Sequence, residues 1–471
     1  MRFGLSEDVI VTMQSVFEAN SKVDKVYVFG SRAKGNYKEG SDIDLAVKGS
    51  ELSEKDILNL YVKLGELNLS NEIDLINYRT INEPALKEHI DRVGIEFYIR
   101  WKKIPLSKTT KFIVDNRGKT VPAESTGIPL IATNCIDNNY LYPVFENIRY
   151  ISKHTYETWF RSHPEPGDII LTLKGSQNGA VCLVPDPVGF VIAQDMVALR
   201  ANEKVIDPHF LFAALRSSEI QYEIKNLDVS GVIPHLKKSD FDKLLLPYPD
   251  LYTQKCIGNI YYVLSCKIDL LQRQNKTLSH LAETLFRQWF VEEKELGEIF
   301  ELCSIASVST GKGLKREEFT TNGEFPIIGA NGEIGRTNKF LTDERLILTG
   351  RVGTLGKVYI NENRVWISDN VLIIKPIEEK YFYPIYFSLL RIDFENMNVG
   401  STQPLVTQND LKKIELNLPS ELKLEEFSNE CSLFFRKINK NNKQIRILTQ
   451  TRDALLPKLM SGEVRIFEAN Q

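Results

Sequence analysis

The stretch GDIILTLKGSQNGAVCLVPDPVGFVIAQDMVAL at residues 167–199 has a counterpart in ERLILTGRVGTLGKVYINENRVWISDNVLII at residues 344–374, with the same succession of apolar runs and glycine-broken turns. A second pair keeps nearly the same offset: SGVIPHLKKSDFDKLLLPYP begins at residue 230 and GSTQPLVTQNDLKKIELNLP at residue 400. Repetition of long segments indicates a duplicated architecture. We therefore expect two domains of similar fold in this chain.

Each of these domains is followed by a long segment with helical periodicity, at residues 251–295 and 421–471. Asn275 and Asn441 occupy core positions of the repeat, where polar groups weaken packing but fix register. The pattern predicts that the two helices pack on each other as a long coiled coil; the alternative is that each covers only its own domain. The other core positions follow heptad steps of three and four: Ile268, Leu271, Leu278, Ala282, Leu285 and Trp289, then Ile438, Ile445, Leu448, Arg452, Leu455 and Leu459.

Residues 1 to about 100 alternate helix and strand patterns. Helical patterns cover residues 8–19, 53–67 and 84–100, and KVYVFG, IDLAV and NEIDLINY are typical of strands. The sequence predicts a small α/β unit that ends near Pro105.

Five residues of this unit could bind a nucleotide and a metal. Gly30 and Ser31 follow a strand at the start of a helix, where unpaired N–H groups and the helix dipole favour phosphate oxygens. Asp42 and Asp44 point to one face if they lie on a strand, and Asp74 adds a carboxylate from a neighbouring strand. Carboxylates and substrate phosphates are preferred ligands of Mg²⁺. We expect Asp74 to orient or deprotonate an attacking hydroxyl.

The segments GSRAKGNYKEGSDIDLAV and NEIDLINY resemble a minimal nucleotidyltransferase of the DNA polymerase β superfamily, over about the first 100 residues. The resemblance implies transfer of a nucleoside monophosphate from a nucleoside triphosphate to a hydroxyl, often on a partner protein. It makes Gly30 and Ser31 the triphosphate site and the three aspartates the metal-binding and catalytic triad. Arg32 and Lys34 are expected to steer the triphosphate, with plain solvation as the alternative. A docking module without activity is the other interpretation.

The rest of the chain resembles the DNA-specificity subunit of type I restriction-modification systems. The resemblance implies two target-recognition domains, held apart by an antiparallel pair of long helices, that each bind half of a split double-stranded DNA site. About forty helical residues at roughly 1.5 Å each would span about 60 Å. It also implies two methyltransferase subunits, which bring S-adenosylmethionine, and a motor-nuclease subunit. The resemblance to this family rests on the repeats above and on the segments IVDNRGKTVP, LGEIFELCSIASVSTGKGLKREEF and ALLPKLMSGEV.

Loops of both domains carry side chains that could contact DNA. Arginine and lysine suit guanine or phosphate, and asparagine and glutamine suit adenine. For each candidate, the alternative interpretation is a solvated loop residue or a turn-former that does not contact DNA. The candidates are Arg117, Lys119, Lys174, Ser176, Gln177 and Asn178 in the first domain, and Lys312, Lys315, Asn331, Arg336, Arg351 and Gln403 in the second.

Composition restricts the remaining possibilities. The formal net charge is −3, so DNA binding must depend on local clusters or on partner subunits. The six cysteines show no C-x-x-C spacing, and no apolar run is long enough for a membrane span, so we expect a cytoplasmic protein. The part beyond residue 104 shows no catalytic motif and is expected to bind without catalysis.

The expected fold class is a multidomain α/β (α+β) chain. Its predicted parts are a nucleotidyltransferase-like domain at 1–104, target-recognition domains at 105–250 and 296–420, and spacer helices at 251–295 and 421–471. The favoured function is that of a type I specificity subunit with an added Mg²⁺-dependent nucleotidyltransferase. The alternative is a protein nucleotidyltransferase of toxin-antitoxin type, whose DNA-binding body localises or gates it.

Overall fold

The computed structural model describes residues 2–67, 69–116, 119–227, 234–292, 297–352, 357–394, 405–462 and 464. The chain divides into two compact units: Met1–Asp269 together with Arg446–Gln471, and Leu270–Ile445. Helices α8 (Leu251–Phe286) and α12 (Glu421–Met460) both cross this division. The two units meet inside these long helices, whereas the five predicted parts have their boundaries elsewhere. The boundaries of the five parts therefore stay predictions.

A small α/β domain opens the first unit. Its sheet has the strand order β3-β2-β1-β4, in which β2 is parallel to β3 and the other neighbours are antiparallel. Met13 and Phe17 are buried with sheet residues such as Val26 and Leu45 in its core. The α/β unit expected from the sequence is confirmed. Its elements are α1 (Glu7–Glu18), β1 (Lys25–Val28), α2 (Gly30–Lys34), β2 (Ile43–Lys48), α3 (Glu54–Gly65), β3 (Ile73–Asn77), α4 (Pro84–Val93) and β4 (Ile95–Ile99).

The predicted helix over residues 84–100 is wrong in its second half. Helix α4 ends at Val93, and β4 pairs with β1 instead. The break falls at Gly94, where a Cβ atom would lie 2.4 Å from the carbonyl oxygen of Ile90. The segment IEFYI carries the β-branched and aromatic residues that strands favour, and pairing with β1 outweighs its helical periodicity.

The next domain of the first unit holds two sheets. One has the order β10-β9-β12-β6, and the other has the order β11-β7-β8 with β11 parallel to β7. A third pair, β13-β5, joins the start and the end of the domain. The elements are β5 (Lys102–Pro105), β6 (Thr110–Asp115), β7 (Ile128–Ile131), β8 (Arg149–Ile151), α5 (Lys153–Thr158), β9 (Ile169–Thr172), β10 (Val181–Leu183), β11 (Val191–Ile192), β12 (Met196–Ala201), α6 (Pro208–Arg216), α7 (Ser218–Asn226) and β13 (Leu245–Tyr248).

The second unit repeats this topology. Its sheets have the orders β15-β21-β18-β19 and β17-β16-β20, again with one parallel pair, β16 and β20, in the smaller sheet. The strands β14 and β22 pair as β5 and β13 do. The duplication expected from the sequence is therefore present in the fold. The elements are β14 (Glu298–Glu301), α9 (Leu302–Ile305), β15 (Ala306–Thr310), β16 (Phe325–Gly329), β17 (Gly332–Thr337), β18 (Leu346–Gly350), β19 (Val358–Asn361), β20 (Trp366–Ile367), β21 (Val371–Pro376), α10 (Phe382–Leu390), α11 (Gln408–Lys412) and β22 (Glu415–Leu418).

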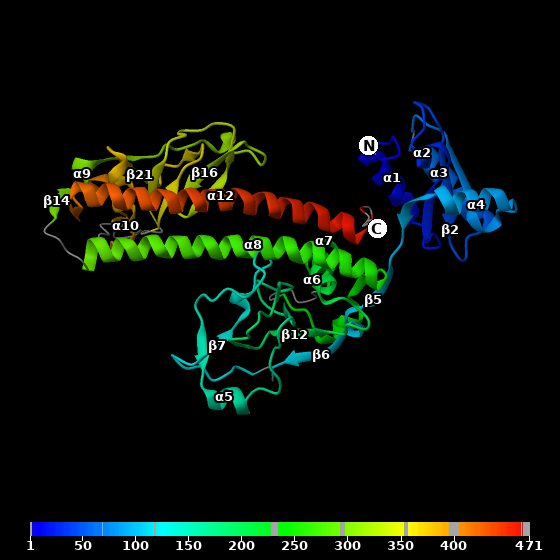
Figure 1. Cartoon of the computed structure of the whole chain (residues 1–471), viewed down its shortest axis with the longest axis horizontal. Coiled ribbons are helices and arrows are strands. Elements are labelled where there is room, and N and C mark those ends of the chain that lie inside the picture. The colour runs from blue at the N-terminus through cyan, green and yellow to red at the C-terminus, as the bar shows by residue number, and fades with distance from the viewer. Residues whose placement is uncertain are drawn as a thin grey trace. The chain divides into compact units, whose positions relative to one another are not determined.

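Helices α8 and α12, green and orange to red in Figure 1, pack on each other inside both units. In the first unit Tyr261 of α8 shares a core with Leu459 of α12. In the second unit Phe286 and Phe427 share the other core, and their ring centroids lie 5.9 Å apart. The early part of α8 thus meets the late part of α12, and the late part meets the early part, as an antiparallel pair requires. None of the described helices has the length and apolar character needed to cross a bilayer.

Candidate functional sites

The turn from β1 into α2 brings the chain against a carboxylate. Gly30 has a φ of 67°, and a Cβ atom there would lie 2.1 Å from Oδ2 of Asp44. The backbone N–H of Phe29 donates to the carbonyl oxygen of Asp44 at 3.0 Å. Glycine is therefore required at residue 30 for the turn to pass so close to β2. Ser31 follows in the first turn of α2.

Three carboxylates lie at one end of the parallel pair of strands. Asp44 of β2 is the register partner of Asp74 of β3, and Asp42 comes just before β2. Asp42 and Asp74 are exposed, whereas Asp44 is half-buried. Burial raises the pKa of Asp44, the nearby Asp74 and Asp42 carboxylates raise it further, and Arg32 opposes them. The sequence pattern therefore located carboxylates that influence one another electrostatically.

These residues fit Mg²⁺ in their chemistry but do not form a ready-made cage. In the part of the chain that the structure describes, no three acidic, histidine or cysteine side chains converge closely enough to hold a metal ion. The assignment of Asp42, Asp44 and Asp74 as metal ligands therefore stays a prediction. Carboxylate oxygens are the ligands that Mg²⁺ prefers, and a cation would reduce the repulsion that raises the pKa of Asp44.

Arg32 does not lie in the solvent-facing position expected of a residue that steers a triphosphate. Its side chain is only 4% exposed and donates to backbone carbonyl oxygens of Phe3, Ser41 and Asp42. Lys34, at the end of the same short helix, is exposed as expected. The guanidinium of Arg32 thus donates its hydrogen bonds to the protein backbone.

The DNA-binding candidates fall into three groups. Two of them, Arg117 and Gln403, lie outside the described residues. The exposed group consists of Lys119, Ser176, Lys312, Lys315 and Asn331, and the partly buried group of Lys174, Gln177, Asn178, Arg336 and Arg351.

Two partly buried candidates, Arg336 of β17 and Asn178 between β9 and β10, hold neighbouring backbone segments in place. Arg336 donates to the carbonyl oxygens of Gly323 and Glu324, at 2.7 and 2.8 Å, and forms an ion pair with Glu333 at 3.1 Å. Oδ1 of Asn178 accepts from the backbone N–H of Leu236 at 3.3 Å. These contacts hold loops in shape, a role that the sequence pattern could not separate from DNA binding.

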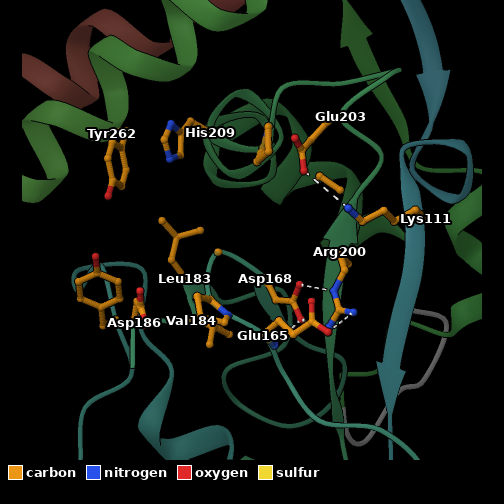
Figure 2. A pocket seen from close by; sticks show the side chains of 15 residues that line it. Lys111, Glu165, Asp168, Leu183, Val184, Asp186, Arg200, Glu203, His209 and Tyr262 are labelled. Atoms are coloured by element: carbon orange, nitrogen blue, oxygen red, sulfur yellow. Dashed lines mark hydrogen bonds and ion pairs between the residues drawn. The ribbon is translucent and has the colours of Figure 1, made fainter. Parts of the chain in front are cut away.

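A pocket of about 470 Å³ lies in the domain that runs from β5 to β13, at its contact with α8 (Figure 2). Two cations line it, and both are paired. Arg200 binds Asp168 through two hydrogen bonds of 2.9 and 3.0 Å and Glu165 through an ion pair of 2.8 Å. Lys111 lies 3.6 Å from Glu203. The positive charges of the pocket are therefore neutralised within it.

The opposite side of the pocket is aromatic, as Figure 2 shows. The rings of His209 and Tyr262 stack with centroids 3.8 Å apart at an angle of 8°. Asp186 adds a further carboxylate to the lining. With its cations paired and carboxylates in excess, the pocket repels phosphate and is unsuited to bind a DNA backbone. The sequence alone gives no signal of this pocket because its residues come from separate segments between residues 111 and 262.

The family described as "Type I restriction modification DNA specificity domain" matches residues 108–280 and 290–446, more than half of the chain. The chain belongs to the type I restriction-modification DNA-specificity family. The family described as "Polymerase beta, Nucleotidyltransferase" matches residues 12–103 of this specificity protein. Both resemblances predicted from the sequence are confirmed.

The relatives of this specificity protein agree with the two matches. The MjaIX specificity subunit of Methanocaldococcus jannaschii is 23% identical over 72% of this chain and 88% of its own length. The HindI specificity subunit of Haemophilus influenzae is 21% identical over 70% and 92%. A solved type I S subunit from M. genitalium, at 20% identity, shares the fold with a TM-score of 0.52 over 76% of this chain and 96% of its own. A candidate protein adenylyltransferase of M. jannaschii is 39% identical over 69 residues, 14% of this chain and 72% of its own length.

Proposed function

We propose that this specificity protein recognises a bipartite site on double-stranded DNA and directs two methyltransferase subunits and a motor-nuclease subunit to it. The observation that supports this most is the duplicated topology, with two matching pairs of sheets on chain segments of different sequence. Two domains of one fold with different loops suit two half-sites of different sequence. S-adenosylmethionine would come with the methyltransferase subunits.

The loop between β15 and β16 is the best-supported DNA contact. Its backbone is held at Lys312, whose N–H donates to the carbonyl oxygen of Ile367 at 2.9 Å and whose carbonyl oxygen accepts from Nε1 of Trp366 at 2.8 Å. Lys312 and Lys315 are exposed, and within the described residues no ion pair engages their ammonium groups. A loop that is anchored at Lys312 and presents two ammonium groups suits a phosphate backbone.

The test is a comparison of the two half-sites. The chain is co-expressed with its methyltransferase subunits, and methylated positions are mapped by sequencing to identify the two half-sites. Binding of the purified complex to labelled duplexes that carry one half-site each is then measured by fluorescence anisotropy. Arg351→Ala, or Lys312→Ala with Lys315→Ala, is expected to weaken binding about tenfold on DNA that retains only the half-site of the second domain. The other half-site should be unaffected. Equal loss on both halves would contradict the assignment. Lys375→Ala, which removes a lysine paired with Glu344 at 2.8 Å in the same domain, is the matched control.

We also infer that the N-terminal domain transfers a nucleoside monophosphate to a hydroxyl of a partner protein. The hydroxyl oxygen bonds to the α-phosphorus, the bond to pyrophosphate breaks, and the hydroxyl proton passes to Asp74. Gly30 and Ser31 hold the triphosphate. Mg²⁺, when bound by Asp42 and Asp44, would neutralise phosphate charge. The register of Asp44 with Asp74 and the 39% identical relative support this second function.

Labelled ATP with Mg²⁺, the purified chain and its neighbouring subunits separate the possibilities. Label transfer that is lost in Asp42→Ala supports an enzyme, with Glu39→Gln in the exposed loop before β2 as the control. Transfer to a small toxin-like partner would favour the alternative in which the DNA-binding body localises or gates the enzyme. Absence of transfer to every partner would favour a docking module.

A further inference from the structure

Arg32 is a charged side chain in the interior of the nucleotidyltransferase-type domain. Nη1 donates to the carbonyl oxygen of Phe3 at 2.7 Å. Nη2 donates to that of Ser41 at 2.6 Å, and Nε lies 3.2 and 3.0 Å from those of Ser41 and Asp42. A buried charge is costly unless hydrogen bonds satisfy it, and here they all go to backbone carbonyls.

These hydrogen bonds join the two halves of the predicted site. Arg32 lies two residues after Gly30, on the turn assigned to the triphosphate. Its acceptors at Ser41 and Asp42 belong to the backbone that leads directly into β2. The carbonyl oxygen of Ser41 also accepts from Nδ2 of Asn71, just ahead of β3, at 3.2 Å. One guanidinium therefore connects the phosphate turn with the approaches to both carboxylate-bearing strands.

Tyr37 supports the guanidinium from within the loop between α2 and β2. The ring centroid of Tyr37 lies 5.3 Å from the guanidinium carbon of Arg32. The planar guanidinium can donate in several fixed directions, whereas the single ammonium of lysine cannot reach carbonyls of three residues in that geometry. Arginine is thus needed at this position for its hydrogen-bonding geometry and not only for its charge.

We propose that Arg32 is a positioning residue for nucleotidyl transfer, which holds the Gly30–Ser31 turn at a fixed distance from Asp42 and Asp44. The inference rests on the proposed transfer activity of this domain. Arg32 touches neither the triphosphate nor the acceptor; it acts through the backbone that carries the carboxylates.

The first test compares Arg32→Lys with Lys63→Met in the full chain. Arg32→Lys is expected to lower kcat of label transfer at least about tenfold, while KM for ATP changes by less than about threefold, because the phosphate turn itself is retained. Lys63→Met changes an exposed lysine of α3 in the same domain, which has no role in the predicted site, and should leave kcat unchanged within about twofold. A purely structural role predicts a loss of folded protein with kcat per folded molecule unchanged, which would overturn the proposal.

The second test does not depend on transfer. Mn²⁺ replaces Mg²⁺ and is titrated by electron paramagnetic resonance in the presence of a non-hydrolysable ATP analogue. Arg32→Lys is expected to weaken Mn²⁺ binding about tenfold or more while binding of the analogue without metal is kept. If the unmodified chain transfers no label, the proposed activity fails but this titration still decides the role of Arg32. Unchanged Mn²⁺ affinity in the variant, or no Mn²⁺ binding by the unmodified chain, overturns the proposal.

A milder variant covers the case in which Arg32→Lys does not fold. Tyr37→Leu removes the ring under the guanidinium and leaves its hydrogen bonds in place. It is expected to lower kcat roughly threefold at unchanged KM. An unchanged kcat in a folded Tyr37→Leu chain, together with a misfolded Arg32→Lys chain, would overturn the positioning role.

Discussion

Gly30 and Gly35 differ in what surrounds them rather than in their backbone. Their φ angles are 67° and 74°, so any other residue would be strained at either position. A Cβ atom on Gly30 would lie 2.1 Å from Oδ2 of Asp44, whereas a Cβ atom on Gly35 would find nothing within 4 Å. A substitution at Gly35 therefore reports backbone strain alone, whereas a substitution at Gly30 reports strain together with displacement of the Asp44 carboxylate.

Alanine at these two glycines should give different losses of activity. Both Gly30→Ala and Gly35→Ala are expected to destabilise the N-terminal domain by roughly 1–2 kcal/mol through backbone strain. Only Gly30→Ala should also reduce label transfer, about a hundredfold or more, because Asp44 must move. Thermal unfolding and transfer rates of the two full-length variants measure this. Similar rates in both variants would show that the contact with Asp44 is unimportant.

Among the secondary-structure elements, helices α8 and α12 meet in the second unit around a polar layer. Nδ2 of Asn441 donates to Oδ1 of Asn275 and to Oε1 of Gln274, both at 2.8 Å. Asn441 is fully buried, and its Oδ1 has no hydrogen-bond partner within the described part of the chain. A buried polar atom without a partner lowers stability, but such a layer favours one register over its neighbours.

Replacing the polar layer should stabilise the helix pair. Asn275→Leu with Asn441→Leu is expected to raise the free energy of unfolding of the second unit by about 1–3 kcal/mol, because the buried Oδ1 of Asn441 that lacks a partner is removed and the remaining partner, Gln274, is exposed to solvent. Asn441→Leu alone should stabilise less, since it leaves Asn275 against an apolar side chain. Thermal melts followed by circular dichroism at 222 nm provide the measurement. A lower melting temperature of the double variant would be contrary to this expectation.

Helix α6 meets α8 through the stacked rings of His209 and Tyr262, which makes this contact sensitive to pH. Burial lowers the pKa of His209, and the Asp207 carboxylate partly opposes this. The neutral ring is therefore favoured in the folded state. Its contribution to stability is complete above the ordinary histidine pKa of about 6.5 and is lost as pH falls through that value toward the lower folded pKa.

His209→Phe should reduce this pH dependence while keeping a ring against Tyr262. Between about pH 7.5 and 5.5 the melting temperature of the first unit is expected to fall less in the variant than in the unmodified chain. His154→Gln alters an exposed histidine of the same domain and serves as the control. The same decrease in His209→Phe and in the unmodified chain would refute the assignment.

For the molecule as a whole, the charge decides how it can bind DNA. The formal net charge is −3, and the pocket of the first target-recognition domain is acidic in balance. Exposed candidates such as Lys312 and Lys315 supply only local positive charge. We therefore expect most phosphate neutralisation to come from the partner subunits.

The salt dependence of DNA binding should therefore increase on assembly. The slope of log K against log salt concentration is expected to become steeper by several units when methyltransferase subunits are added, since each neutralised phosphate contributes about −0.9. Fluorescence anisotropy with a labelled duplex, at several salt concentrations, gives both slopes. Equal slopes for the isolated chain and the complex would mean that this chain makes most of the phosphate contacts itself.

Much of this architecture could be predicted from the sequence because it depends on local periodicity. The duplication, the strands that carry it and the polar core positions Asn275 and Asn441 follow from repeats and heptad spacing. Asp42, Asp44 and Asp74 could be selected because side chains two residues apart on a strand share a face. The same local rule failed at residues 95–99, where pairing with β1 outweighed helical periodicity.

Only the tertiary structure decided which polar side chains face solvent and which hold the chain together. Arg32 and Arg336 look like loop cations in the sequence, but both bind backbone carbonyls. The pocket of the first target-recognition domain draws Lys111, Arg200 and Tyr262 from distant segments. A guanidinium is buried only where carbonyls from several segments converge on it, and that convergence results from packing of the whole domain, which local sequence does not specify.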